Sequence, residues 1–432
     1  MKYIRTYGDY NSWKTDYSDP NRGFRLKPTL YKYSDVSVES RILLENDDPR
    51  KYGDSTYIKI YIDSDIEFSF YIGNKPGDTQ TTMTCTIDWG DGVIEDKNIT
   101  ADSNGFKLSH SYTGRNFRAI ELYNVERDYI IPGYDGYTPE SLISRPSIVK
   151  NTILGNSVVS IGLGAFYYCE SLTSVYIPES VVSIGNSAFY GCFSLTSVYI
   201  PKGVTSIGDE AFSGCTSLTS VHIPESVTSI GEYAFSNCSG LTSAYIPKSV
   251  TSTGVDVFGG CTSLTTVYIS EGVTSIGGGI FKDCTSLTTV YIPEGVTSIG
   301  NDIFKDCTSL TTVYIPGSIT LINSYAFYNC SSLTSVYISE GVTEIGWSVF
   351  YNCSSLTSVY IPESATIVGK GAFSSCTSLT SISSLNTTAP TLGSGAFSDL
   401  PTNGTLYIKP GATGYDAWLS ALPSGWKIVE SL

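Results

Sequence analysis

The sequence has few charged residues, almost no histidine and no long apolar run. Of its 432 residues, 16% are charged and only two are histidines, His110 and His222. Because these two lie in different parts of the chain, His-based triad catalysis is excluded. No run of about 18 apolar residues could span a bilayer, and the first residues contain no apolar segment typical of a secretory signal. We therefore expect neither membrane insertion nor, from the sequence as given, export by the general secretory route.

Basic residues are scarce as well, and the formal net charge is -15. A surface that follows a phosphate backbone or an anionic membrane needs clustered Lys and Arg, so nucleic acid and anionic lipid are excluded as partners. The imbalance is greatest in residues 151–432, which hold 7 basic and 18 acidic side chains. With so few charges, Ser and Thr must cover much of the surface.

Ten of the eleven cysteines recur at a constant interval of 23 residues. Ten repeats run from Val158 to Thr387 without an insertion, and Val204 to Ser226 (VTSIGDEAFSGCTSLTSVHIPES) is a typical unit. A fixed period of this length predicts a solenoid, in which each repeat forms one coil and buries its faces against its neighbours. The cysteines of the period are Cys169, Cys192, Cys215, Cys238, Cys261, Cys284, Cys307, Cys330, Cys353 and Cys376.

Five apolar positions recur with the same period and predict the core. They begin at Ile161, Phe166, Leu172, Val175 and Ile177. The segment LTSVYI has the spacing of a leucine-rich repeat, in which a short strand alternates inward and outward side chains. The Phe and Cys of AFSGC are three residues apart, as in one helical turn. We therefore predict a mainly β fold with short helical or irregular arcs.

The repeat SLTSVYIPEGVTSIG, followed by a Phe and a Cys, resembles the BspA-like leucine-rich repeats, also called Treponema-type. That resemblance covers about two thirds of the chain and implies a surface recognition or adhesion module without catalytic activity. Before the repeats, TCTIDWGDGVIED (Thr84 to Asp96) and LSHSYTG (Leu108 to Gly114) resemble PKD-like β-sandwich domains. The segment Thr405 to Glu430 is similar to the closing segment of BspA-like arrays.

These patterns predict a leucine-rich-repeat solenoid of 23-residue units preceded by a β-sandwich domain. The expected parts are an N-terminal arm of unknown structure (1–51), a PKD-like β-sandwich (52–131), a linker with the N-terminal cap of the solenoid (132–157), ten repeats (158–387), and a degenerate repeat with the C-terminal cap (388–432).

The residues on either side of the strand Val point away from the predicted core and form two outward columns. One column consists of Ser and Thr, beginning at Ser174. The other is aromatic and is the candidate ligand-binding surface: Tyr176, Tyr199, His222, Tyr245, Tyr268, Tyr291, Tyr314, Tyr337 and Tyr360. Tyr combines an apolar ring with a hydroxyl, which suits glycans and protein surfaces. Two alternatives stay open: the rings only stack and stiffen the sheet, or they form an assembly interface.

The cysteine column predicts buried free thiols. In-register coils place equivalent Cβ atoms about 4.8 Å apart, farther than the roughly 3.8 Å of a disulfide. A zinc site needs a convergent cluster, whereas these residues form a linear array. We therefore expect no metal, no cofactor and no catalytic residues. Buried reduced thiols also indicate folding in a reducing compartment.

The sequence thus predicts a non-enzymatic surface recognition or adhesion protein whose partner is a host glycan or protein surface, located at the cell surface or outside the cell. The alternative is a structural component of a phage virion, such as a fibre or head-decoration protein, that uses the repeats for host or mucosal attachment at the virion surface. In either case residues 1–51 are a candidate segment for docking or oligomerisation.

Overall fold

The computed structural model describes residues 158–430 without a gap, and before them residues 3–7, 28–32, 58–64, 68–74, 82–89, 93–100, 106–111, 116–123, 129–131 and 149–154. The chain divides into two units, Met1–Gly53 and Asp54–Leu432. In the first, β1 (Tyr3–Tyr7) and β2 (Pro28–Lys32) pair antiparallel. Most of the predicted arm (1–51) and most of the predicted linker at 132–157 lie outside the described residues.

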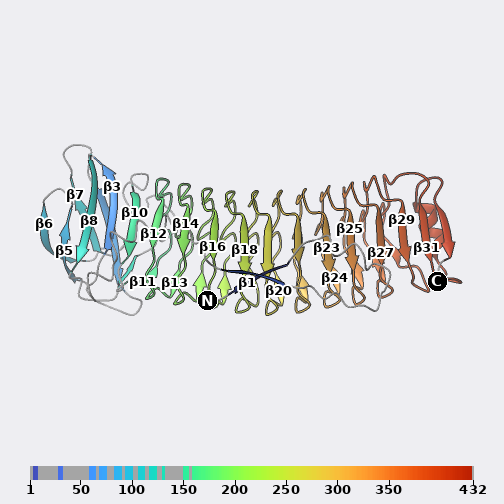
Figure 1. Ribbon diagram of the computed structural model, residues 1–432, viewed down its shortest axis with the longest axis horizontal. Helices are drawn as coiled ribbons and strands as arrows, with labels where there is room; N and C mark the ends of the chain where they lie inside the picture. Colours follow the sequence, from blue (N-terminus) through green and yellow to red (C-terminus); the bar gives the residue numbers. More distant parts are fainter. Residues whose placement is uncertain are drawn as a thin grey trace. The chain divides into compact units, whose positions relative to one another are not determined.

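The second unit contains a β-solenoid in which each coil contributes one strand from the LTSVYI segment. Most of these strands pair parallel and in register with their equivalent in the next coil, as Val198 with Val221 and Tyr199 with His222 illustrate. Successive coils therefore lie side by side in chain order (Figure 1). The strands are β10 (Val149–Leu154), β12 (Ser174–Tyr176), β14 (Ser197–Tyr199), β16 (Ser220–His222), β18 (Ser243–Ile246), β19 (Thr266–Ile269), β21 (Thr289–Tyr291), β23 (Thr312–Ile315), β25 (Ser335–Ile338), β27 (Ser358–Ile361), β29 (Ser381–Ser384) and β31 (Thr405–Ile408).

Most coils contain a second, shorter strand that the sequence analysis did not predict. It comprises the Ser-Ile of VTSIG, or the equivalent residues of a varied repeat, and pairs parallel with its equivalent in an adjacent coil. These strands are β11 (Val158–Ile161), β13 (Ser183–Ile184), β15 (Ser206–Ile207), β17 (Ser229–Ile230), β20 (Ser275–Ile276), β22 (Ser298–Ile299), β24 (Leu321–Ile322), β26 (Glu344–Ile345), β28 (Ile367–Val368) and β30 (Thr391–Leu392).

The arcs between the strands are turns rather than α-helices. The N–H of each repeat Cys donates to the carbonyl of the Phe three residues earlier, at 3.1 Å for Cys169 and Phe166. The residue before the Cys has a positive φ, such as 57° at Asn237 and 59° at Asp283. Such a residue cannot continue a right-handed helix, and Asn, Asp and Gly adopt this conformation most readily. In the described part of the chain, the one helix is α2 (Tyr415–Ala421).

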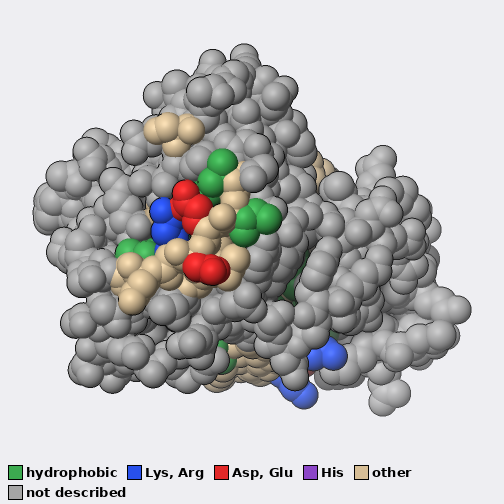
Figure 2. Space-filling model, turned by 90° about the vertical axis from the view of Figure 1, so that its left-hand side faces the viewer, with side chains coloured by type: hydrophobic (Ala, Val, Ile, Leu, Met, Phe, Trp, Pro, Cys, Tyr) green, Lys and Arg blue, Asp and Glu red, His purple; other side chains and the backbone are tan. Residues whose placement is uncertain are grey.

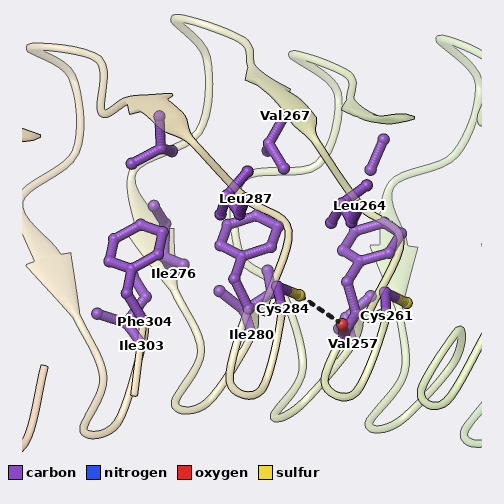
Figure 3. Close-up of a cluster of buried hydrophobic side chains, with 14 of the residues drawn as sticks. Val257, Cys261, Leu264, Val267, Ile276, Ile280, Cys284, Leu287, Ile303 and Phe304 are labelled. Atoms are coloured by element: carbon purple, nitrogen blue, oxygen red, sulfur yellow. Dashed lines mark hydrogen bonds between the residues drawn. The ribbon is translucent and has the colours of Figure 1, made fainter. Parts of the chain in front are cut away.

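All five predicted apolar columns are buried in the core. The Phe column forms a continuous stack from Phe166 to Phe397, with neighbouring ring centroids 5.0 to 6.0 Å apart. Figure 3 shows three coils of this core, where Leu264 and Leu287 lie near the rings and Cys261 and Cys284 lie beside them. Each coil thus buries its apolar side chains against the preceding and following coils, as a solenoid requires.

The two sheets at the N-terminal end of the solenoid continue into the strands that precede the repeats. One sheet has the order β16-β14-β12-β10-β3-β8-β5-β6, and the other has the order β17-β15-β13-β11-β9-β4-β7. The added strands are β3 (Ile58–Ser64), β4 (Phe68–Asn74), β5 (Thr82–Asp88), β6 (Ile94–Thr100), β7 (Phe106–His110), β8 (Asn116–Tyr123) and β9 (Tyr129–Ile131). The first coil is therefore not left with open strand edges, which would invite aggregation.

Strand β6 ends the eight-stranded sheet and carries charged side chains. Lys97 forms an ion pair with Glu95, and Thr86 donates a hydrogen bond to Asp96 at 2.7 Å. The described side chains at this end mix hydrophobic, acidic and Lys groups (Figure 2). Charges on an edge strand oppose pairing with another chain.

Residues after the last repeat close the C-terminal end of the core. Strand β32 (Lys427–Glu430) extends the sheet beyond β31, and Trp418 of α2 packs edge-on against Phe397. The indole N–H of Trp418 donates to the carbonyl of Pro390 at 2.9 Å. No helix within the described ranges is long and apolar enough to cross a membrane.

Candidate functional site

The structure places the nine predicted aromatic residues in one row on the first strand of successive coils. We call this row, Tyr176 to Tyr360 at 23-residue steps, the tyrosine face. In β19, Val267 and Ile269 are buried while Thr266 and Tyr268 point outward. Partners such as Tyr314 and Tyr337 face each other across neighbouring strands in register. The alternation of the strand therefore positions every ring outside the core.

Neighbouring rings of the tyrosine face stack on one another. The ring planes are nearly parallel for His222 and Tyr245 (centroids 6.3 Å apart), Tyr245 and Tyr268 (5.5 Å), and Tyr314 and Tyr337 (5.4 Å). Stacked rings cover each other's faces, so at these pairs the surface offers ring edges and hydroxyl groups. Tyr199 and Tyr337 are the most exposed members of the row, at 51% and 38%.

Four hydroxyl groups of the tyrosine face donate hydrogen bonds to Glu side chains of the preceding coil. The Glu lies 20 residues before its Tyr, and the bonds are Tyr199–Glu179 (3.2 Å), Tyr245–Glu225 (2.7 Å), Tyr314–Glu294 (2.7 Å) and Tyr360–Glu340 (3.0 Å). These pairs were not predicted from the sequence. The signal was available in the sequence, because each Glu comes directly after the YIP, HIP or YIS of the preceding coil and the coils are in register.

The surroundings of three of these phenols favour the protonated form. Burial is the main cause that raises the pKa of Tyr245, to about 12, although Ser270 opposes the shift and Glu225 adds to it. Burial also raises the pKa of Tyr314 and Tyr360, and the hydrogen bond to Glu340 contributes at Tyr360. At these three positions the tyrosine face therefore presents neutral hydroxyl groups beside carboxylates.

The outward hydroxyl column lies directly beside the tyrosine face. Its members are exposed or half-buried: Ser174, Ser197, Ser220, Ser243, Thr266, Thr289, Thr312, Ser335 and Ser358. A further Thr column, one residue earlier in each repeat, serves the structure. In it, Thr196 Oγ1 and its backbone N–H both donate to the carbonyl of Thr173 at 3.2 Å. This bond recurs along the coils, for example from Thr265 to Thr242.

The repeat cysteines are buried free thiols, as predicted. Each Sγ from Cys192 onward donates to the carbonyl of the Phe 26 residues earlier, at 3.3 Å for Cys284 and Phe258 (Figure 3). Burial raises the pKa of Cys261 to about 12, which opposes the thiolate needed for metal binding or nucleophilic attack. Within the described residues, no three His, Cys, Asp or Glu side chains are placed to hold a metal ion.

Comparison with solved structures finds bacterial leucine-rich-repeat proteins. One from Bacteroides ovatus is 26% identical, with a TM-score of 0.47, over 66% of this chain and 85% of the other. A leucine-rich cell surface protein from Faecalibacterium prausnitzii is 27% identical, with a TM-score of 0.38, over 71% and 95%. The T. pallidum leucine-rich-repeat protein is 27% identical, with a TM-score of 0.31, over 51% and 86%. No curated protein matches the chain.

The family model of the BspA type leucine-rich repeat region matches the solenoid directly. Its matches comprise six copies and cover residues 146–265, 182–311 and 297–410. These ranges contain the repeat Cys, the buried Phe column and the strands of the tyrosine face. The chain therefore belongs to the family of BspA type leucine-rich-repeat proteins.

Proposed function

We propose that this protein is a non-enzymatic recognition or adhesion protein that presents the tyrosine face to a glycan or protein partner at a cell surface. The observation that carries the proposal is the row itself, in which nine coils hold an aromatic ring outside the core in register. Many weak contacts along such a row can add up to a stable complex with a partner, because a surface that is already rigid before binding loses little entropy. Neutral phenols and neighbouring Ser and Thr hydroxyls suit glycan hydroxyls and peptide carbonyls.

Contacts other than the outward rings hold neighbouring coils together. The rings are therefore not needed for the stability of the solenoid, which supports a binding role for them. The Phe stack, the parallel strand pairs and the hydrogen bonds of the further Thr column already join neighbouring coils. Outward rings add a smaller stabilisation, because they are only partly buried. The Tyr–Glu hydrogen bonds also hold the hydroxyl groups in fixed positions, which lowers the entropy lost when a partner binds.

In this proposal, the strands of residues 52–131 form a PKD-like β-sandwich. This domain separates the solenoid from the surface to which the protein is attached. Residues 1–51 would then serve for docking or oligomerisation. The name of the F. prausnitzii relative, a cell surface protein, agrees with a surface location.

A virion fibre or head-decoration protein is the second candidate function. The column of ten buried free thiols supports it, because such a column suits assembly in a reducing cytoplasm. Quantitative mass spectrometry of washed cell envelopes and of density-purified cell-free particles from the source culture separates the two settings. Enrichment in envelopes supports the surface protein, and enrichment in particles supports the virion protein.

The binding role is tested by replacing three central rings, Tyr268, Tyr291 and Tyr314, with Ala. The matched control replaces Tyr167, Tyr328 and Tyr351, which stack in the arcs away from the tyrosine face. Both variants and the parent protein are applied to glycan arrays and immobilised matrix proteins. We expect the first variant to lose at least tenfold in affinity for whichever partner the parent binds, and the control to retain it. Equal binding by all three proteins would contradict the proposal.

A further inference from the structure

We propose that the solenoid contains a joint between the coils that begin at Ser220 and Ser243. At this joint the strands and the turn of the later coil open away from the earlier coil, while the arcs stay attached. We call residues 243–253 the joint segment. The stability of a repeat array is a sum of contacts within each coil and between neighbours, so local opening begins at the weakest interface.

Both rows of strands are interrupted at the joint segment. In the row of LTSVYI strands, one sheet ends at β16 and the next begins at β18. In the row of VTSIG strands, Thr253 makes a single bridge to Ile230, whereas β15 and β17 pair through two residues each. Among the repeats, which the structure describes throughout, no other coil has both interruptions.

Two core positions of the joint segment hold smaller or polar side chains. Ala244 stands where the other repeats have Val or Ile, and Thr253 stands where they have Ile or Val. Both residues are buried, so the coil loses apolar contact with its neighbours. The hydroxyl of Thr253 accepts the N–H of Gly277 at 2.9 Å, a group that in other coils donates to a backbone carbonyl.

The turn of the joint segment lacks two hydrogen bonds to the preceding coil. Where this turn carries a Ser, the hydroxyl donates to the carbonyl of the Val 22 residues earlier, at 2.7 Å for Ser226. Ser249 occupies the same position, but its buried Oγ has no partner, which is unfavourable. In most coils the Thr of VTSIG donates to its equivalent one coil earlier, as Thr228 does to Thr205 at 3.2 Å. This bond is missing between Thr251 and Thr228.

The aromatic rings are farther apart at the same place. On the tyrosine face, the centroids of His222 and Tyr245 are 6.3 Å apart, compared with 5.5 Å for Tyr245 and Tyr268. In the core, the spacing rises from 5.2 Å for the pair that ends at Phe235 to 5.5 Å for the pair that ends at Phe258. The joint therefore lies within the tyrosine face, and its opening changes the spacing of the rings on either side, whatever they bind.

The arcs on the other side of the coil keep their connections and form the hinge. The backbone N–H groups of Tyr233, Phe235 and Asn237 donate to carbonyls of the next arc at 2.7 to 2.9 Å. The hydroxyl of Tyr245 also donates to Glu225 at 2.7 Å, between two exposed groups, and opening breaks this bond. The joint segment is thus attached along the arc and weakly held along its strands and turn.

The interface between β25 and β27 provides a comparison within the chain. These strands also belong to different sheets, but the turn that follows β27 is held by several bonds. Ser364 donates to the carbonyl of Val342 at 2.7 Å, and Glu340 accepts the backbone N–H groups of Glu363 and Ser364 at 3.1 Å. Both core positions of that coil hold Val. An interrupted sheet alone therefore does not make a joint.

Trypsin tests the joint, because matched cleavage sites lie in the joint segment and two repeats earlier. Lys248 and Lys202 are both exposed, and both follow a strand and its Ile-Pro. Cleavage in a folded turn needs local opening, so its rate reports how often each turn opens. The full chain is digested briefly, and both cuts are quantified by mass spectrometry. Each rate is divided by that of a synthetic peptide spanning the same site. We expect cleavage after Lys248 to be about tenfold faster than after Lys202.

The first variant, Ala244→Val/Thr253→Ile, restores the core residues of a regular repeat. The next coil accommodates the same two residues, so we expect the variant to fold. Added apolar contact between the coils should slow cleavage after Lys248 at least fivefold. Unchanged cleavage after Lys248 in this variant would overturn the inference, as would equal normalised rates at the two sites in the parent chain.

The matched second variant, Val198→Ala/Ile207→Thr, places the same two deviations in the coil of Lys202 and should speed cleavage there. Hydrogen exchange of the parent chain gives a readout that needs no substitution and no protease. Amide groups of residues 245–252 should exchange at least tenfold faster than those of residues 199–206. Equal exchange in the two segments would contradict the joint.

Discussion

Replacing one core ring and one outward ring of the same coil distinguishes a structural from a binding role of the tyrosine face. Phe281 is fully buried between Phe258 and Phe304, with ring centroids 6.0 and 5.6 Å away. Truncating a buried Phe to Ala costs about 3–5 kcal/mol. Tyr291, in the next strand of that coil, is half-buried. Losing the half-buried part of this aromatic side chain costs about 1–2 kcal/mol.

The two variants Phe281→Ala and Tyr291→Ala are compared by urea denaturation, followed by far-UV circular dichroism. Neighbouring coils unfold as coupled units rather than as one two-state domain, so the whole curve is compared as well as its midpoint. We expect a large downward shift for Phe281→Ala and a small one for Tyr291→Ala. If Tyr291→Ala lowers the urea midpoint as much as Phe281→Ala does, the outward rings hold the coils together. This result would contradict a binding role for the tyrosine face.

Further predictions concern single contacts. The pKa of Tyr245 is raised to about 12, above the ordinary value of about 10. The stability that this shift contributes is therefore complete below pH 10 and is lost as the pH rises towards 12. Between pH 10 and pH 12, the urea midpoint of Tyr245→Phe should fall less steeply than that of the parent protein. A thiol reagent should react slowly with the native protein and should reach all 11 cysteines only after denaturation; rapid native reaction would contradict the buried thiol column. Gly317→Ala should lower the urea midpoint more than Gly278→Ala, because the added Cβ meets a carbonyl oxygen at 2.1 Å in the first case and at 3.2 Å in the second.

The repeat made most of the fold predictable. A 23-residue period without insertions places equivalent residues side by side, so the Phe, Leu and Val columns could be assigned to the core and the Tyr column to the outside before any coordinates were known. The two-residue strands such as β13 were missed because two extended residues leave no alternating pattern. The continuation of both sheets into β3 and β9 was missed because pairing between distant, non-repeating strands leaves no local signal.

The chemistry of the tyrosine face was less predictable than its position. The Tyr199–Glu179 bond joins residues on successive coils, and its presence depends on how far the turn carries the Glu back towards the ring. Gly317 stands where the neighbouring coils have Glu, and the close approach of the Glu340 carbonyl leaves no room for a side chain there. Both features follow from backbone distances of a few ångströms, which a repeat pattern does not specify.

Protection of tyrosine side chains on binding is the most direct measurement of the central claim. Tyr199 and Tyr337 on the tyrosine face are 51% and 38% exposed, while Tyr168, Tyr233 and Tyr325 in the arcs are 37 to 39% exposed. Limited iodination of the full chain, quantified residue by residue by mass spectrometry, is carried out with and without the partner identified on the arrays. We predict that the partner protects Tyr199, Tyr337 or both and leaves the three arc tyrosines unchanged. Protection of the arc tyrosines, with the tyrosine face still reactive, would contradict the account.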